Sequence, residues 1–198
     1  KGGRFYRGWW QNILSDYRKY ILIDGVRTVE VDYCNMSLRM LYAKRNCEYS
    51  AELDAYDLGL PNWKGKQDIR RPSIKQFINA LLNDEDGVYK LNKKDVKTLG
   101  LDHYEMLALV KKVHGPIFDL ITAGGGQGIQ YEDSQIAQDI LLELLNDNIT
   151  CLSVHDSFIV QYQHADRLVE VMKSVFKNRL GAVGVLDMVE GHQNIHID

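Results

Sequence analysis

The stretch Thr28-Val29-Glu30-Val31-Asp32-Tyr33 decides the fold, because it has the pattern of a short buried strand that ends in a carboxylate. A second apolar stretch, residues 152–160, has the same character and carries Asp156. If the two strands lie side by side in one sheet, Asp32 and Asp156 come within reach of a shared pair of divalent cations. Two carboxylates that share metal ions ~3.5–4 Å apart are the minimum apparatus for two-metal phosphoryl transfer.

The rest of the chain alternates predicted strands and helices. Strands are expected at residues 21–23 and 28–31, and a hairpin at 150–154 and 157–161 with its turn at His155-Asp156. Helices are expected at about residues 36–45, 72–82, 94–98, 102–113, 133–146 and 165–180, with a short helix up to Thr122. The fold class that follows is α+β, with a helical block inserted between strands of one sheet.

Three local signals refine this prediction. Asp102 is the expected N-cap of its helix, and Gly181 is the expected glycine after the last one. Residues 124–128, Gly-Gly-Gly-Gln-Gly, are expected to form a flexible turn, because their spacing fits neither a Walker nor a Rossmann phosphate loop.

Composition limits the possible classes of protein. The 198 residues are 45% apolar, enough for one sizeable core or for one domain with an inserted lobe. No apolar run approaches the ~18 residues of a membrane span, and no signal peptide is visible, so a cytoplasmic protein without membrane contact is expected. Three cysteines without a CxxC pair indicate a reducing compartment and no structural zinc. Because the chain starts at Lys1 rather than Met, a fragment or a processed product is expected.

Charge is distributed unevenly along the chain. Residues 1–75 hold 14 Lys/Arg and 9 Asp/Glu, whereas residues 76–198 hold 10 and 18. A basic N-terminal half could follow a phosphate backbone, and chance asymmetry on solvated faces is the alternative.

Four stretches, in order, resemble the polymerase module of family A DNA polymerases and, more loosely, the single-subunit phage-type RNA polymerases. Gly3-Arg4 with Gln11-Asn12-Ile13 is similar to the family's GR…LQNIP segment, and residues 31–39, VDYCNMSLR, to its DYSQIELR motif. Residues 71–75, RPSIK, fit the RxxxK start of the fingers helix, and residues 154–157, VHDS, resemble the VHDE or HDS hairpin. A weaker match is Gly128-Ile129-Gln130, which resembles PIQG.

The resemblance implies a palm sheet with a reduced helical fingers insertion. The implied division is residues 1–69 for the first palm part, 70–130 for the fingers-like region and 131–198 for the second palm part. The implied activity is template-directed nucleotidyl transfer, as in a polymerase or primase, with two Mg²⁺ or Mn²⁺ ions, a nucleic-acid primer and template, and nucleoside triphosphates. A thumb would come from another chain or from a missing N-terminal part, and a bacterial, phage or mobile-element origin is implied. The alternatives are a minimal DNA polymerase and a non-catalytic nucleic-acid-binding relative.

Site residues follow from the matched motifs. Asp32 and Asp156 are the implied catalytic residues, and Asp32, Tyr33 and Asp156 the implied metal-binding set. The implied nucleotide-binding residues are Arg71, Lys75, Ser37, Asn79 and Asn83, and the implied nucleic-acid-binding residues are Arg4, Gln11, Gln130 and His155. Trp9 and Trp10 are interpreted as core residues, with stacking on a base as the alternative.

The residues that would surround the sugar of the nucleotide give the most specific prediction. Ser37 replaces the Glu of the ELR motif, and Asn79 and Asn83 replace the family's aromatic residues on the fingers helix. A small hydroxyl and two amides leave an open, polar pocket that accepts a ribose 2′-OH rather than rejecting it. Ribonucleotide use is therefore expected.

Overall fold

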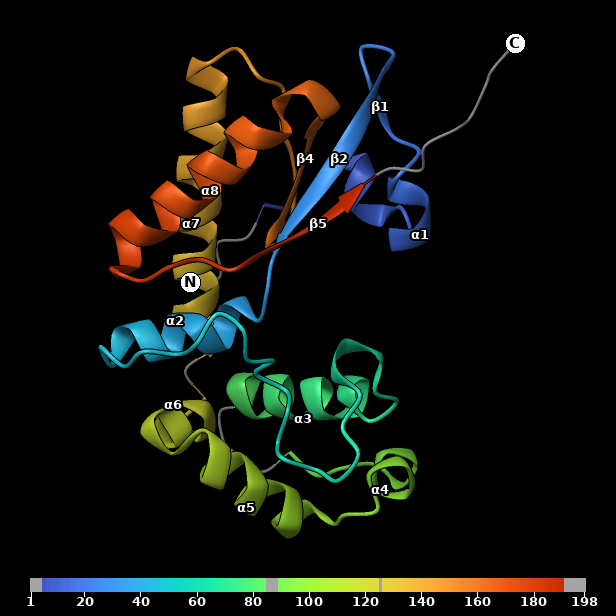
Figure 1. Cartoon of the computed structure of the whole chain (residues 1–198), viewed down its shortest axis with the longest axis vertical. Coiled ribbons are helices and arrows are strands. Elements are labelled where there is room, and N and C mark those ends of the chain that lie inside the picture. Colours follow the sequence, from blue (N-terminus) through green and yellow to red (C-terminus); the bar gives the residue numbers. More distant parts are fainter. Residues whose placement is uncertain (1–4, 85–88, 125, 191–198) are drawn as a thin grey trace. The chain divides into compact units, whose positions relative to one another are not determined.

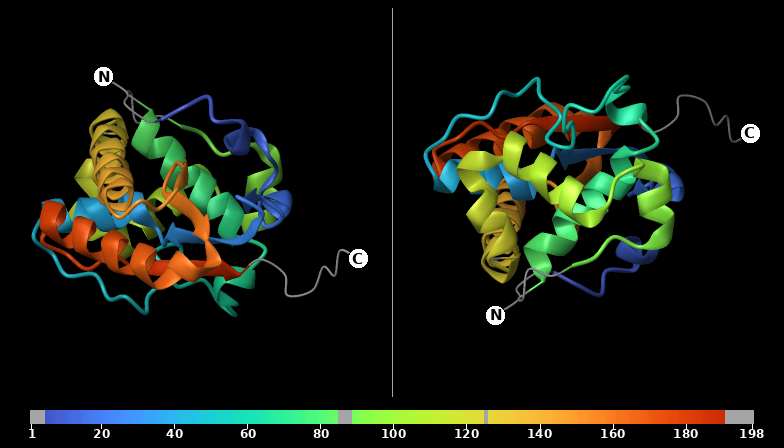
Figure 2. Two further views of the ribbon diagram at one scale, coloured as in Figure 1. Left: turned by 90° about the horizontal axis from the view of Figure 1, so that it is seen from above. Right: turned by 90° about the horizontal axis from the view of Figure 1, so that it is seen from below.

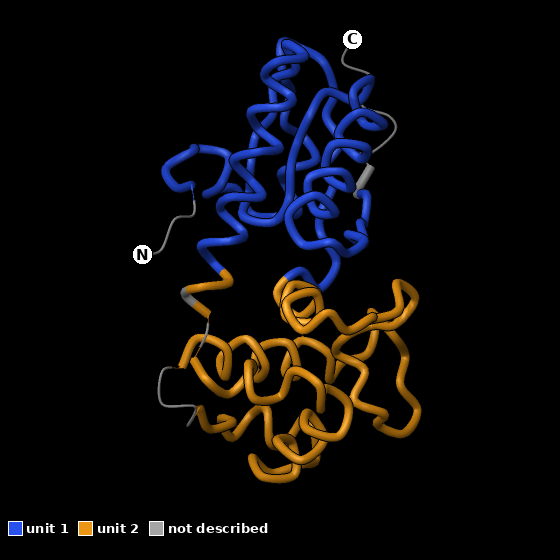
Figure 3. Tube along the Cα trace, turned by 90° about the vertical axis from the view of Figure 1, so that its left-hand side faces the viewer, with its two compact units in different colours: residues 1–36, 130–198 blue, residues 37–129 orange. Residues whose placement is uncertain are grey.

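The structure is a computed structural model that describes residues 5–84, 89–124 and 126–190. The chain folds into two compact units (Figure 3). Unit 1 comprises residues 1–36 and 130–198, and unit 2 comprises residues 37–129. Unit 2 therefore begins at Ser37 and not near residue 70, because the segment between them packs within unit 2, where Asp54 binds Arg71.

A five-stranded antiparallel sheet forms the centre of unit 1 (Figure 1). Its strands are β1 (Leu22–Ile23), β2 (Val26–Tyr33), β3 (Leu152–Val154), β4 (Ser157–Gln161) and β5 (Leu186–Glu190). Strand β2 is central: residues 28–32 pair with β4, and residues 29–33 pair with β5. Strands β3 and β4 form the predicted hairpin, whereas β5 was not predicted from the sequence.

Helix α8 (Ala165–Leu180) covers one face of this sheet and contacts β2 and β4 (Figures 1 and 2). The buried side chains of Val29, Val31 and Tyr33 alternate along β2 and face it, as expected for a half-buried strand. The Tyr33 hydroxyl donates to the Met172 carbonyl at 2.6 Å. After α8 the chain passes close to Tyr33 at Gly184, where a Cβ would lie 3.0 Å from the Tyr33 ring and 3.1 Å from the Phe176 ring, so a larger residue there would require these rings to shift.

The other elements of unit 1 are short, except for one long helix. They are η1 (Trp9–Asn12), α1 (Ser15–Arg18), η4 (Tyr162–His164) and the part of α7 (Gly126–Asn146) that follows residue 129. Helix α7 starts at Gly126, so the turn predicted at residues 124–128 is wrong for Gly126–Gly128. These residues form the first helical turn because the helical register of the long apolar stripe extends back through them.

Unit 2 is helical. It contains α2 (Met36–Lys44, from residue 37), η2 (Gly65–Gln67), α3 (Arg71–Asn83), α4 (Lys93–Leu99), α5 (His103–Val113), η3 (Gly115–Ile117) and α6 (Phe118–Thr122). Helix α3 supplies the centre of its core, because Ile74, Phe77, Ile78 and Leu81 are fully buried. Asp102 caps α5 through the Glu105 N–H at 2.9 Å, as predicted.

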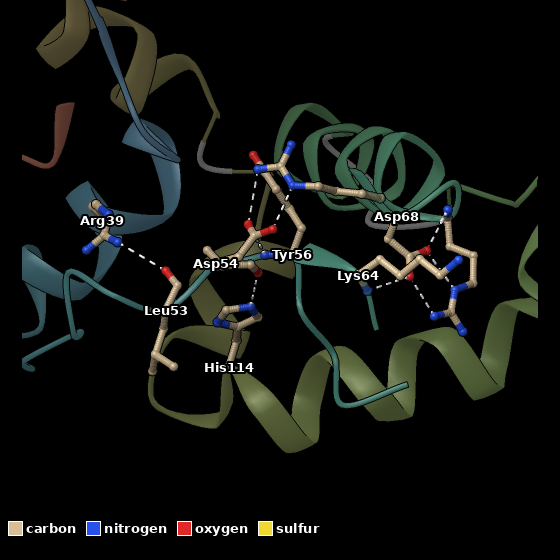
Figure 4. Close-up of polar contacts among 10 residues, drawn as sticks. Arg39, Leu53, Asp54, Tyr56, Lys64, Asp68 and His114 are labelled. Carbon is tan, nitrogen blue, oxygen red and sulfur yellow. Dashed lines mark hydrogen bonds and ion pairs between the residues drawn. The ribbon is translucent and has the colours of Figure 1, made fainter. Parts of the chain in front are cut away.

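Two buried side chains hold the irregular segment after α2 in place (Figure 4). Arg39 is 6% exposed, and its guanidinium donates to four main-chain carbonyls between Tyr49 and Leu53. His114 is fully buried and lies 2.8 Å from the Ala55 carbonyl and 3.0 Å from the Tyr42 hydroxyl. Arg39 therefore has a structural role: its hydrogen bonds satisfy main-chain carbonyls that no regular secondary structure satisfies.

Candidate functional site

The β3–β4 hairpin places Asp156 beside the end of β2. Asp32 is directly opposite Ser157 in the register of β2 and β4, and Asp156 precedes Ser157 at the turn. The Tyr33 N–H donates to the Asp156 carbonyl at 3.2 Å, so the main chain of Asp156 lies next to that of Tyr33. The two aspartates that the sequence singled out therefore occur on adjoining parts of one sheet, 124 positions apart in the chain. The distance between their carboxylates stays a prediction.

A third carboxylate, which sequence reasoning missed, lies in the same row. Asp187 of β5 is the register partner of Asp32 on the opposite edge of β2. Directly opposed residues of antiparallel strands share a face, so Ser157, Asp32 and Asp187 form one row across three strands. Like charges directly opposite each other destabilise a sheet. Asp187 could have been suspected only after β5 was recognised, and its sequence, LDMVE, carries a weak strand pattern.

A buried polar link ties β4 to β2 one row away. The Ser157 hydroxyl, in a residue 4% exposed, donates to the Glu30 carboxylate at 2.6 Å. Glu30 in turn accepts two hydrogen bonds from the Arg18 guanidinium, at 2.9 and 3.0 Å. This Arg18–Glu30–Ser157 link fixes the first residue of β4, next to Asp156, and it was also not predicted from the sequence.

The hairpin turn has an unusual backbone. His155 has a φ of 56°, in the left-handed region that most non-glycine residues avoid. Its exposed ring contacts the Tyr6 ring edge-on, with centroids 6.2 Å apart. A positive φ is usual in two-residue hairpin turns, so this backbone has a local structural cause, and the role of His155 stays a prediction.

The Tyr33 side chain does not lie with the carboxylates. Its phenol is on the α8 face of β2, and burial together with the nearby Asp133 raises the pKa of the Tyr33 hydroxyl far above its usual range. A metal ligand from Tyr33 would therefore have to be its main-chain carbonyl.

The predicted nucleic-acid contacts have different outcomes. Arg4 lies outside the described residues. The Gln11 amide donates to the carbonyls of Phe5 and Ser153 at 2.9 and 3.1 Å, which gives it a structural role in joining η1 to β3. Gln130 is half-buried on α7. Their contacts with nucleic acid stay predictions.

The two adjacent tryptophans have different environments. Trp10 donates from Nε1 to the Ser153 carbonyl at 2.9 Å and packs against the small cluster of Ile21, Val154 and Ile159. Trp9 is 60% exposed, so the interpretation as a core residue is right for Trp10 and wrong for Trp9. The difference arises because Trp9 and Trp10 are consecutive residues of the 3₁₀ helix η1, so their side chains point in different directions.

The described residues contain no group of three or more His, Cys, Asp or Glu arranged to hold a metal ion. Mg²⁺, however, is usually bound by one or two carboxylates together with waters and substrate phosphates, and not by a complete protein cage. A Mg²⁺ site that Asp32 and Asp156 share with waters and phosphates stays a prediction, and Asp187, the register partner of Asp32, adds a third carboxylate to this row.

Helix α3 of unit 2 carries four of the predicted nucleotide-binding residues on one face. Arg71, Lys75, Asn79 and Asn83 recur every four residues and all lie off the buried stripe of the helix. Arg71 is already engaged: it makes a bidentate pair with Asp54 at 2.7 and 3.1 Å, and its guanidinium lies 5.0 Å from the centre of the Tyr56 ring. Lys75 is exposed, with its ammonium 6.0 Å from the same ring.

The other members of this set are less free to contact a ligand. The Asn83 amide donates to the Asn79 carbonyl at 2.7 Å and so closes the last turn of α3. Ser37 is half-buried in the first turn of α2. Asp68 forms a second acid–guanidinium pair with Arg70 at 2.7 Å, and this guanidinium lowers the pKa of the Asp68 carboxyl well below its usual range.

The predicted site residues thus form two groups, one in each unit. Asp32, Asp156, His155, Gln11 and Gln130 belong to unit 1, and Arg71, Lys75, Ser37, Asn79 and Asn83 belong to unit 2. The predicted meeting of Arg71 and Lys75 with Asp32 stays a prediction. The basic half at residues 1–75 is also divided: unit 1 holds 10 Lys/Arg and 15 Asp/Glu, and unit 2 holds 14 and 12.

The fold is similar to that of a solved polymerase. It matches the POL domain of Pol1 from M. smegmatis, determined in a complex with DNA primer-template and dNTP, with a TM-score of 0.53 and 10% identical residues. The likeness covers 90% of this chain and 43% of that one, so the chain spans less than half the length of the structure it matches. At this identity the likeness concerns the fold alone. No protein-family model and no curated protein sequence matches the chain.

Among the described residues, none of the helices combines the length and the apolar character that crossing a membrane requires. In the described part of the chain, Cys34, Cys47 and Cys151 form no disulfide bond. Burial raises the pKa of the Cys151 thiol to about 12. A thiol with that pKa is inert at neutral pH, so Cys151 is not a candidate nucleophile.

Proposed function

We propose that the chain is a nucleotidyltransferase that extends a primer on a nucleic-acid template. The observation that carries the proposal is the register of β2 and β4, which brings Asp32 opposite Ser157 and the main chain of Asp156 against Tyr33. The α+β fold, similar to that of a DNA polymerase domain, supports the same reading. In this proposal unit 1 is the palm and unit 2 a reduced, helical fingers region.

Asp32 and Asp156 would hold two Mg²⁺ ions, for which carboxylate oxygens are suitable ligands. Such ions lower the pKa of an attacking hydroxyl and stabilise the charge on a leaving pyrophosphate. The chain's own contribution would be to hold the main chain of Asp156, at the β3–β4 turn, against the end of β2, which limits the reorganisation that the reaction requires.

Lys75 and Arg71 would bind the triphosphate. Lys75 offers an exposed ammonium, which acts as a point charge toward phosphate oxygens. Arg71 offers a planar guanidinium that Asp54 and the Tyr56 ring hold in one orientation. Because Asp54 accepts two of its N–H groups, Arg71 would bind a phosphate by exchanging Asp54 for the phosphate.

Primer extension tests the proposal. A labelled primer–template is incubated with the chain, with Mg²⁺ or EDTA, and with each of the four triphosphates. Template-dependent, EDTA-sensitive extension supports it, whereas nucleic-acid binding without extension under any divalent cation supports the non-catalytic alternative. A thumb supplied by another chain would appear as extension that starts only when a partner fraction is added.

We also propose that the enzyme accepts ribonucleotides, because Ser37 is small and polar. Replacing Ser37 by Glu should lower ribonucleotide incorporation selectively, because the longer carboxylate would crowd a 2′-OH. The measurement is the ratio of kcat/KM for ribo- and deoxynucleotides in the wild type and in Ser37→Glu, with Ser37→Ala as a matched small control. A wild type that strongly prefers deoxynucleotides would make the chain a minimal DNA polymerase.

A further inference from the structure

An open apolar groove lies on unit 1 at the start of the sheet. It has a volume of about 370 Å³ and is lined by six residues of η1, α1 and β1 with the segments beside them: Trp9, Ile13, Tyr17, Tyr20, Ile21 and Leu22. Its three aromatic rings are well exposed, at 60% for Trp9, 60% for Tyr17 and 47% for Tyr20. Several large exposed apolar side chains in one place usually mark an interaction surface.

The groove is built on a fixed base. The Trp9 ring lies edge-on to the Trp10 ring, with centroids 6.0 Å apart, and Trp10 is anchored to the Ser153 carbonyl. Ile21 is 5% exposed and belongs to the cluster that joins this region to β3 and β4. The aromatic rings are thus presented by a preformed support, which lowers the entropy cost of binding.

The chemistry around the groove favours a nucleic-acid strand over a protein. The Lys19 ammonium lies 5.2 Å from the centre of the Tyr20 ring, and lysine is depleted in the cores of protein–protein interfaces. Arg18, next to Tyr17 in the chain, is bound by Glu30, so the positive charge that the structure places beside the rings comes from Lys19. Aromatic platforms with neighbouring cations are the usual means of binding single strands, because every base has a face that can stack.

We propose that this groove, Trp9 to Leu22, binds the unpaired stretch of a nucleic-acid strand by stacking bases on Trp9, Tyr17 and Tyr20. Leu22 is paired with Arg27 on β2, and Asp32 is five residues further along the same strand. That separation is ~17 Å at ~3.4 Å per residue, which roughly five stacked nucleotides span. Whether the bound strand is a template or a primer rests on the proposed function. Binding of a single strand to the groove does not depend on catalysis.

The test measures the affinity of the whole chain for a fluorescent single-stranded oligo(dT) and for a blunt DNA hairpin by anisotropy. Trp9→Ala, Tyr17→Ala and Tyr20→Ala should each weaken oligo(dT) binding about 5- to 100-fold, because each removes one stacking surface. Tyr17→Phe and Tyr20→Phe keep the ring and should bind almost as the wild type does. Tyr162→Ala is the matched control, because Tyr162 is an exposed tyrosine of unit 1, at 61%, outside the groove.

Each outcome decides the proposal. Loss of oligo(dT) affinity in the alanine variants, with little change in hairpin affinity and in melting temperature, supports it. Unchanged affinity in all three alanine variants overturns it. A wild type that sediments as a dimer, with Trp9→Ala and Tyr17→Ala variants that sediment as monomers, also overturns it, because the groove would then be an interface between copies of the chain. Asp156→Asn separates the two proposals: it should keep full oligo(dT) affinity while losing primer extension.

Discussion

The two aspartates of unit 1 that are predicted to be catalytic and three aspartates of unit 2 have different neighbours. In unit 2, Asp54, Asp68 and Asp119 each bind a guanidinium, from Arg71, Arg70 and Arg45. In unit 1, Asp32 has another aspartate, Asp187, as its direct register partner, and Asp156 belongs to the turn beside it. Unit 1 also contains acids that bind a guanidinium, such as Glu30 and Asp147, so the difference lies in the row of Asp32 and Asp187, where two acids are register partners.

Breaking the carboxylate group of unit 1 should have the largest effect. Asp156→Asn should lower primer extension by at least about 10³-fold, because several kcal/mol of metal-mediated charge stabilisation are lost and each ~1.4 kcal/mol is a factor of ten. Thermal unfolding should change little, since Asp156 is half-buried at a turn. The measurement is single-nucleotide extension, with Asp166→Asn on α8 as the control; extension at the wild-type rate would remove Asp156 from the mechanism.

Replacing Lys75 tests whether unit 2 contributes to nucleotide binding. Lys75→Ala should raise the nucleotide KM about 10- to 100-fold, because a charge-assisted hydrogen bond to phosphate is lost. Affinity for the primer–template should stay close to that of the wild type. Lys111→Ala, an exposed lysine on α5, is the matched control. An unchanged KM in Lys75→Ala would mean that this face of α3 does not bind the triphosphate.

Variants of the Arg18–Glu30–Ser157 link test whether catalysis requires a fixed position of the β3–β4 hairpin. Ser157→Ala should lower kcat about tenfold with little effect on the nucleotide KM, because one hydrogen bond to a buried carboxylate positions the residue next to Asp156. Glu30→Gln, which still accepts from Ser157 but loses the charge that binds Arg18, should have a smaller effect. Arg167→Gln, which removes an ion pair elsewhere in unit 1, is the control. Equal losses in all three variants would indicate a general effect on stability instead.

Unit 2 should lose stability in mild acid through His114. Burial lowers the pKa of His114 below its ordinary value of 6.5, despite the hydrogen bond to the Ala55 carbonyl. Since the unfolded state then binds a proton that the folded state does not, the contribution of His114 is fully present above about pH 6.5 and is lost as the pH falls below that value. Urea unfolding between pH 7.5 and 5 should therefore show a steeper loss in the wild type than in His114→Gln. Parallel curves would exclude His114 as the cause.

Local patterns were enough to predict most of the helices and strands. The period-2 alternation of β2, the caps of α5 and α8, and the hairpin at His155-Asp156 were all predicted, because each depends on residues that are neighbours in the chain. Strand β5 was missed, because its pairing with β2 joins segments more than 150 positions apart and its own five residues carry little signal.

The sequence by itself determined the α+β class, the two aspartates at strand ends, and the i, i+4 face of α3, since these follow from chain-local spacing and side-chain chemistry. Only the tertiary structure decided that Asp187 faces Asp32, that Glu30 binds Ser157 and Arg18, that Asp54 engages Arg71, and that Trp9 is exposed while Trp10 is packed. The physical reason is that strand register and ion-pair partners are set by packing between distant segments. For Asp32, Glu30 and Asp187, which lie on strands, a register shift of one residue would turn the side chain to the other face of the sheet.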